Sequence, residues 1–374
     1  MFALEQNESP ADNAASLENL LSSLSMFQVS HPYDTIYCFI SLAKNGEDIP
    51  IRYDQSLLQV LAEAVWRAID GSKSVDIICR PWAPTAREIQ MHNERFKANE
   101  RVILPSWIRD TSFSEFAPRT QKVGVQYDRI NAASFVGPPG KPIYNAANSS
   151  KFTTMSDQFT VNQITDYKMQ CILKLRGLLV DVISSDGGNL RGPASRGIIP
   201  ASWAKLARWE PKIPNGKGVP TAFWRTLCGS RSLDGSEPPN WYGKACEHAW
   251  ELSASGNLDT EWMINHCGSS MTVEFLKKVR STVWDRQMFK TKNVGMLGLG
   301  PSNSQDEMTV RDVDEVWVVK GCSVPVILRR IPSLGGADRH SFVGESYVHG
   351  LMGGGWREIV GTARENEWMN LQVV

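Results

Sequence analysis

Apolar residues recur at three- and four-residue steps in two segments near the N-terminus, which is the spacing of one helix face. The first segment is SLENLLSSLSMF, residues 16–27, with Ser16 in position to cap a helix. The second, IPIRYDQSLLQVLAEAVWRAID, predicts a longer helix that ends at Gly71. Between them, HPYDTIYCFISLA begins with turn residues and predicts a buried strand or a short helix. We therefore expect residues 1–71 to form a helical part. The core face of the first helix would consist of Leu17, Leu20, Leu21, Leu24 and Phe27.

Proline interrupts the pattern in the next part of the chain, residues 72–142. Pro81, Pro84 and Pro105 punctuate this stretch, and helical spacing is only partial over Ala86–Phe96. Residues 112–142 resemble an extended linker that ends in GPPGKP. We expect an irregular, Pro-rich connection.

The period of the apolar residues changes to two after residue 143. FTVNQITD and MQCILKLRGLLVDVIS are rich in β-branched and large apolar residues and predict strands, and GPASRGII near residues 192–199 predicts a loop. Residues 200–285 return to helical spacing. Three further segments predict strands: MFKTKNVGMLGLGP, DEVWVVKGCSVPVILRRI and HSFVGESYVHGLM.

The fold class predicted from this order is α+β. A helical N-terminal part precedes a β-rich, barrel- or sheet-like C-terminal domain, residues 143–374, with a helical insertion at about 200–285. The strands on both sides of the insertion are expected to share one sheet or barrel, because three or four strands alone leave edges uncovered. The insertion is rich in tryptophan, which we expect mainly in the core, although interfaces also favour this residue. Its tryptophans include Trp203, Trp209, Trp224, Trp250, Trp262 and Trp284.

Composition narrows the class of protein. The 374 residues are 42% hydrophobic and carry 40 basic and 40 acidic side chains, so the overall charge provides no attraction to nucleic acid or to anionic lipid. The seven scattered cysteines suit reduced thiols in an intracellular protein. The acidic, polar N-terminus does not resemble a signal peptide, and no apolar run is long enough to cross a membrane. We expect a cytoplasmic protein with no nucleic-acid or membrane partner and no cofactor.

One short stretch carries candidate chemistry. FVGESYVHGLM, residues 342–352, places a carboxylate, a phenol and an imidazole at alternate positions, Glu345, Tyr347 and His349. In a strand these three side chains and Val343 would share one face, where a carboxylate and a histidine could perform acid–base catalysis. The other interpretation is a structural strand whose glycines let another backbone approach closely.

Other motifs give weaker indications. NVGMLGLGPSN has the order G-x-x-G-x-G followed by a polar turn, so a hairpin is favoured over a dinucleotide-binding loop. A zinc site is not favoured, because the C-x-H and H-C spacings suit no common zinc site. The sequence has no G-x-S-x-G elbow and no H-E-x-x-H motif. The absence of these motifs favours a protein that is not an enzyme. The residues weighed for zinc are Cys228, Cys246, His248, His266 and Cys267.

Read in order, several segments resemble the fungal heterokaryon-incompatibility (HET) domain proteins. HPYDTIYCFISLA resembles the end of the HET domain, with Tyr33 where the family has Arg, and IRYDQSLLQVLAEAVWRAI is similar to the helix that follows. SVDIICRPWAP, LPSWIRD, YNAANS, LKLRGLLVDVI, NVGMLGLGP, VVKGCSVPVILRR and FVGESYVHGLM resemble later landmarks, in the family's order. The resemblance covers almost the whole chain after residue 16.

The resemblance implies a role in self/non-self recognition between fungal colonies, linked to programmed cell death. The family's opening Y-x-A-L-S-Y-x-W-G segment and its W-x-x-R-x-W-x-x-Q-E stretch are not found here, so residues 1–71 would be the C-terminal remnant of a HET-like domain. HET domains have been linked to TIR-like domains, which cleave NAD or assemble as death-signalling modules.

Three hypotheses follow. The leading one is a non-enzymatic regulatory or recognition protein of the HET type that acts through a protein partner. The second is a small-molecule-binding or hydrolytic domain that uses Glu345, Tyr347 and His349, which requires these side chains to converge in one pocket. The third is a truncated, inactive gene product, which would expose Leu17, Leu20 and Leu24.

Overall fold

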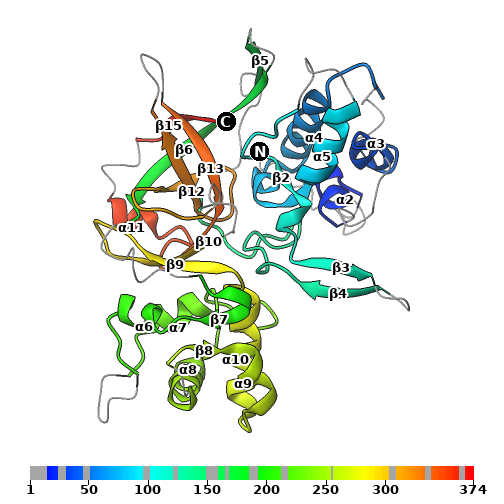
Figure 1. Ribbon diagram of the computed structural model, residues 1–374. Helices are drawn as coiled ribbons and strands as arrows, with labels where there is room; N and C mark the ends of the chain where they lie inside the picture. The colour runs from blue at the N-terminus through cyan, green and yellow to red at the C-terminus, as the bar shows by residue number, and fades with distance from the viewer. Residues whose placement is uncertain are drawn as a thin grey trace, which may run out of the picture.

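The computed structural model describes residues 15–23, 31–44, 51–95, 102–120, 125–148, 159–164, 168–184, 193–211, 218–253, 256–302, 309–332, 338–361 and 367–374. Helices gather at the N-terminus and in the insertion, and strands form most of the rest (Figure 1). The α+β class is therefore confirmed.

The N-terminal helices form where their apolar faces predict them. α4 (Leu57–Ser72) begins at a capping box, in which Ser56 and Gln59 each accept a bond from the other's backbone N–H. The helix ends at Ser72, one residue beyond the predicted end at Gly71, and its C-cap Lys73 takes the left-handed conformation. The HPYDTIYCFISLA segment forms a helix, α3 (Asp34–Ile40). α2 (Leu17–Ser23) buries Leu17, whereas Leu24 and Phe27 lie outside the described residues.

The connection has more regular structure than its prolines indicate. The segment with only partial helical spacing forms a helix, α5 (Ala86–Arg95). Part of the expected linker forms a β-hairpin, in which β3 pairs antiparallel with β4. A parallel pair, β1 with β2, precedes the hairpin. The elements are η1 (Asp76–Cys79), β1 (Pro81–Ala83), β2 (Arg109–Asp110), η3 (Thr111–Phe113), β3 (Phe116–Thr120) and β4 (Val125–Arg129).

Five strands close into a barrel in the order β11-β12-β13-β15-β6, and β6 pairs back to β11. Neighbours are antiparallel except β13 and β15, which are parallel. β5 extends the wall beyond β6. Strands on both sides of the insertion therefore share one barrel, as predicted. The bounds are β5 (Phe159–Ile164), β6 (Lys168–Val182), β11 (Glu315–Val319), β12 (Val326–Ile331), β13 (Arg339–Glu345) and β15 (Met369–Val373).

The helical insertion lies against a smaller sheet of β9, β10 and β14 (Figure 1). β9 and β10 form the hairpin predicted from NVGMLGLGPSN. The predicted loop near residues 192–199 contains a 3-10 turn and a two-residue strand. The remaining elements are η5 (Ser195–Gly197), β7 (Ile198–Ile199), α6 (Ser202–Leu206), α7 (Thr221–Leu227), α8 (Trp241–Leu252), β8 (Leu258–Asp259), α9 (Thr260–His266), α10 (Ser270–Val283), β9 (Arg286–Lys290), β10 (Leu297–Pro301), β14 (Tyr347–Val348) and α11 (Trp356–Val360).

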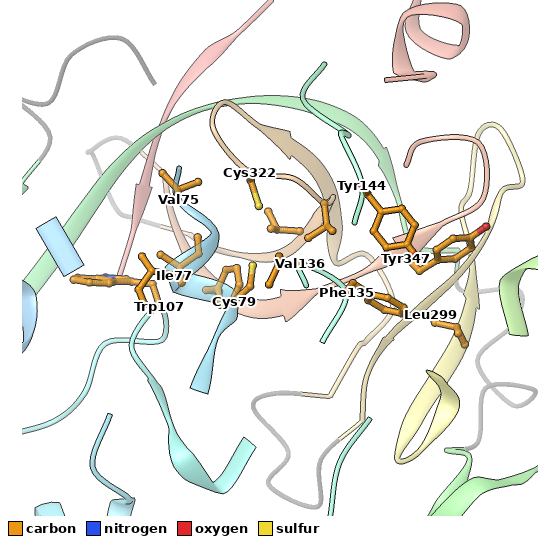
Figure 2. Close-up of a cluster of buried hydrophobic side chains, with 14 of the residues drawn as sticks. Val75, Ile77, Cys79, Trp107, Phe135, Val136, Tyr144, Leu299, Cys322 and Tyr347 are labelled. Carbon is orange, nitrogen blue, oxygen red and sulfur yellow. The ribbon is translucent and has the colours of Figure 1, made fainter. Parts of the chain in front are cut away.

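One continuous core takes residues from the N-terminal helices, the connection and the C-terminal domain. Figure 2 shows Val75 and Cys79 beside Cys322, with Val136 and Tyr347 continuing the same cluster. Backbone bonds reinforce this contact, because the Val75 N–H donates to the Gly321 carbonyl at 2.9 Å. The start of the connection, directly after α4, is thus packed against the turn between β11 and β12.

The barrel wall separates two apolar clusters. On β11, Trp317 and Val319 belong to the main core, whereas Val316 and Val318 belong to a second cluster. A strand covered on both faces reads as a continuous apolar run, which explains the sequence EVWVV.

β6 must bend to pair with β15 along one half and with β11 along the other, and Gly177 pairs with both. A methyl group at Gly177 would lie 2.5 Å from Leu371 Cδ1 and 3.1 Å from Trp317 Cε3, both in the main core. This bend therefore requires glycine.

Replacing Gly177 with alanine should lower the free energy of unfolding by about 1–3 kcal/mol, because the added methyl overpacks the wall. Chemical denaturation measures this loss. Gly268→Ala is the matched control, because its methyl would meet no atom within 4 Å. Equal stability of the two variants would contradict the account of the bend.

Candidate functional site

The stretch FVGESYVHGLM is two strands of different sheets. β13 ends at Glu345 and pairs with β12 in the barrel, whereas β14 begins at Tyr347 and pairs with β10. At the break, the Ser346 N–H and hydroxyl both donate to the Pro325 carbonyl, at 2.9 and 3.0 Å. Uninterrupted alternation across this stretch was therefore a wrong expectation.

Glu345 binds three neighbouring residues of the connection. Its carboxylate accepts the Phe135 N–H at 3.0 Å, the Ser134 hydroxyl at 2.9 Å and the Val136 N–H at 3.4 Å. The Arg286 guanidinium donates to the same carboxylate at 2.7 Å. One side chain at the end of β13 thereby holds the connection and the first residue of β9.

Arg286 is fixed as firmly as its partner. It also donates to the carbonyls of Thr282 and Ala133, each at 2.9 Å, and its guanidinium lies 3.6 Å from the centre of the Phe135 ring. The two side chains of the ion pair are only 7% and 12% exposed. Burial of both charges is tolerated because several hydrogen bonds satisfy each group.

Tyr347 and His349 form a separate polar contact. The Tyr347 hydroxyl lies 2.6 Å from Ser230 Oγ and 3.2 Å from His349 Nδ1. Burial raises the pKa of Tyr347, and burial together with Arg225 lowers the pKa of His349. At neutral pH the phenol is protonated and the imidazole is neutral, so the pair can exchange hydrogen bonds without carrying charge.

The three predicted side chains are brought together only in part. Glu345 and Tyr347 both contact Phe135, the first through its backbone N–H and the second ring to ring at 6.0 Å. His349 is bonded to Tyr347. Glu345 alone of the three lines the cavity described below. The single catalytic pocket required by the hydrolytic hypothesis is not formed by these residues.

A cavity of about 360 Å³ opens beside Glu345, where the N-terminal part, the connection and the C-terminal domain meet. Three arginines line it, and all are buried: Arg80 at 5%, Arg109 at 7% and Arg286 at 6% exposure. Proline and aromatic side chains add apolar surface to the wall. These residues are Pro81, Phe113, Phe116, Pro138, Pro139, Trp284 and Pro301.

Sequence reasoning missed the three arginines. Each follows or interrupts an apolar run, in IICRPW, SWIRD and VWDRQMF, and this context indicates a charge that the fold must bury. Their convergence could not be foreseen, because they lie in η1–β1, β2 and β9, which are far apart in the chain.

The cysteines and histidines weighed for zinc are used otherwise. Cys228 and Cys246 are buried, and burial raises the pKa of the Cys228 thiol to about 11. His248 Nδ1 contacts Thr272 Oγ1 at 2.8 Å, and His266 Nδ1 contacts the Trp262 carbonyl at 2.7 Å. Among the described residues, no group of three or more His, Cys, Asp or Glu side chains is placed to hold a metal ion.

Of the six tryptophans named above, five are buried, as expected of core residues, and Trp262 is 54% exposed. Trp241, a seventh tryptophan of the insertion, is half-buried. Over the described ranges, no helix has the length and apolarity needed to cross a membrane. Comparison with protein-family models, curated proteins and solved structures finds no match to this chain.

Replacing Glu345 with glutamine should reduce the free energy of unfolding by about 3 kcal/mol or more, because Arg286 would stay buried without its counter-charge. The measurement is urea denaturation. Glu237→Gln is the control, since Glu237 is 65% exposed in its pair with Arg225 and should lose less than about 1 kcal/mol. Similar small losses of unfolding free energy in both variants would show that the buried pair stabilises the fold no more than the exposed pair does.

Proposed function

We propose that this chain is a non-enzymatic regulatory or recognition protein of the heterokaryon-incompatibility type, which acts through contact with a protein partner. The ordered resemblance of its segments to that family is the first support. The observation that favours a protein contact is the exposure of Trp262 in an insertion where five other tryptophans are buried and Trp241 is half-buried.

Trp262 has the features of a contact residue. Its ring stacks on the His266 ring, with centroids 4.6 Å apart and planes 14° apart, and the cap from Asp259 fixes its backbone N–H at 2.9 Å. A large aromatic ring held in one orientation loses little conformational freedom on binding. Met271, at the start of α10, is also exposed. Tryptophan is among the residues that contribute most to protein interfaces.

The polar groups of FVGESYVHGLM support a structural role for that stretch. Glu345 joins the connection and Arg286, and Tyr347 is 1% exposed and bonded to Ser230 and His349. These groups have partners within the fold, as expected of residues that hold parts of a recognition protein together. The alternative of a truncated, inactive product predicted that Leu17, Leu20 and Leu24 are exposed. Leu17 is 8% exposed and belongs to the main core, Leu20 is half-buried against that core, and Leu24 lies outside the described residues.

The functional test expresses the chain in a filamentous fungus and fuses this strain with one that lacks the chain. Viable fused cells are then counted as those that exclude a dye. The wild-type chain should lower this viability. Trp262→Ala should restore most of it, and Leu233→Ala, which truncates another exposed apolar side chain, should behave like the wild type. A wild-type chain without effect, or Trp262→Ala as active as the wild type, would contradict the proposal.

The same assay separates recognition from hydrolysis. Tyr347→Phe and His349→Gln remove the phenol and the imidazole, so a hydrolytic mechanism predicts loss of the effect in both variants. The recognition proposal predicts that both variants keep it, provided that thermal unfolding shows them to be folded.

A further inference from the structure

The cavity beside Glu345 combines features that a purely structural void does not need. Long charged side chains are seldom buried, because removing each from water is costly. Here three guanidinium groups, from Arg80, Arg109 and Arg286, are buried around one hollow of about 360 Å³. This volume lies at the small end of the range typical of small-molecule sites.

Backbone carbonyls hold the three guanidinium groups in place. Arg80 donates to Gly137, Arg109 donates to Val343 at 3.1 Å, and Arg286 donates to Thr282 and Ala133 at 2.9 Å. A carbonyl fixes the orientation of a guanidinium without neutralising its charge. Arginines fixed in this way are preorganised donors, and their planar fork matches the oxygens of a carboxylate or phosphate.

The acidic groups near the cavity already accept bonds from the protein. Glu18 pairs with Arg80 at 3.0 Å and Glu345 with Arg286 at 2.7 Å. Besides Glu345, two carboxylates line the wall. Glu115 pairs with Arg129 at 2.6 Å, and Asp285 accepts the Arg196 N–H at 2.9 Å. Neither takes an arginine of the cavity in these bonds.

Arg109 lies against an aromatic ring of the cavity wall. It lines the cavity with its guanidinium 4.0 Å from the centre of the Phe113 ring. Gly344 packs beside it: a methyl group there would lie 2.9 Å from Pro301, which is too close, and 3.4 Å from Arg109 Nη1, an ordinary contact distance. Trp284 and Phe116 add aromatic surface to the same wall, where a planar organic body could pack.

We propose that this cavity binds a small organic oxyanion, a phosphate or carboxylate on a flat apolar body, with Arg109 as its main anionic contact. This inference does not depend on the proposed recognition function. Because Arg80 and Arg109 come from the connection and Arg286 from the C-terminal domain, the bound anion would join the same two regions that Glu345 joins.

The test is isothermal titration calorimetry of the full chain with phenyl phosphate, benzoate, inorganic phosphate and the neutral analogue benzamide. At least one of the two aromatic oxyanions should bind, and benzamide should bind at least about tenfold more weakly, because charge-assisted hydrogen bonds would be lost. The relative affinities of phenyl phosphate and benzoate identify the preferred anion. Binding of inorganic phosphate alone would overturn the organic part of the proposal.

Variants locate the bound probe. Arg109→Gln should weaken binding by about tenfold or more, and Arg330→Gln, which changes an arginine outside the cavity that is 58% exposed, should bind like the wild type. If Arg109→Gln fails to fold, Ala132→Trp fills the cavity from its half-buried lining and should abolish binding. No binding of either aromatic oxyanion at millimolar concentration, or equal binding to wild type and Ala132→Trp, would overturn the proposal.

Discussion

The ion pair between Glu345 and Arg286 is the interaction on which the arrangement of the barrel, the helical insertion and the connection depends. It lies where β13 leaves the barrel, where β9 leaves the helical insertion, and where residues 134–136 of the connection pass between them. A buried carboxylate costs free energy unless its oxygens are satisfied, and here the partners come from separate segments. The pair therefore specifies how those segments meet.

The barrel can tolerate this junction because its wall is closed. β6 contacts β15 and β11 in turn, with Gly177 at the change of partner, so the barrel leaves no unpaired edge at this point. The chain can then leave the barrel after Glu345 and enter a second sheet at Tyr347. The cavity with its three arginines forms in the space next to this exit.

Much of the fold could be predicted from the spacing of apolar residues. The amphipathic face of α4 and the turn with Gly295 between β9 and β10 are local features, and local features are readable from one sequence. The break after Glu345 was missed because the two-residue alternation of the sequence continues through Ser346. In the structure, β13 ends at Glu345 and β14 begins at Tyr347. The hairpin of β3 and β4 was missed because proline and polar residues dominate its neighbourhood.

The candidate site was less predictable than the fold. Glu345 stood out as a carboxylate in an apolar strand, but its partner Arg286 lies 59 positions away. Arg80 and Arg109 are brought to the cavity only by the packing of the N-terminal part and the connection on the barrel. Such convergence is a property of the topology, which one sequence does not display.

Native-state hydrogen exchange of the Phe135 and Val136 amides tests the central role of Glu345 most directly. If Glu345 binds these N–H groups as part of the common core, they should exchange as slowly as the β11 amides of the barrel. Exchange as fast as that of the exposed Tyr127 region in the hairpin would contradict the account. In that case the connection would not be held by the buried pair.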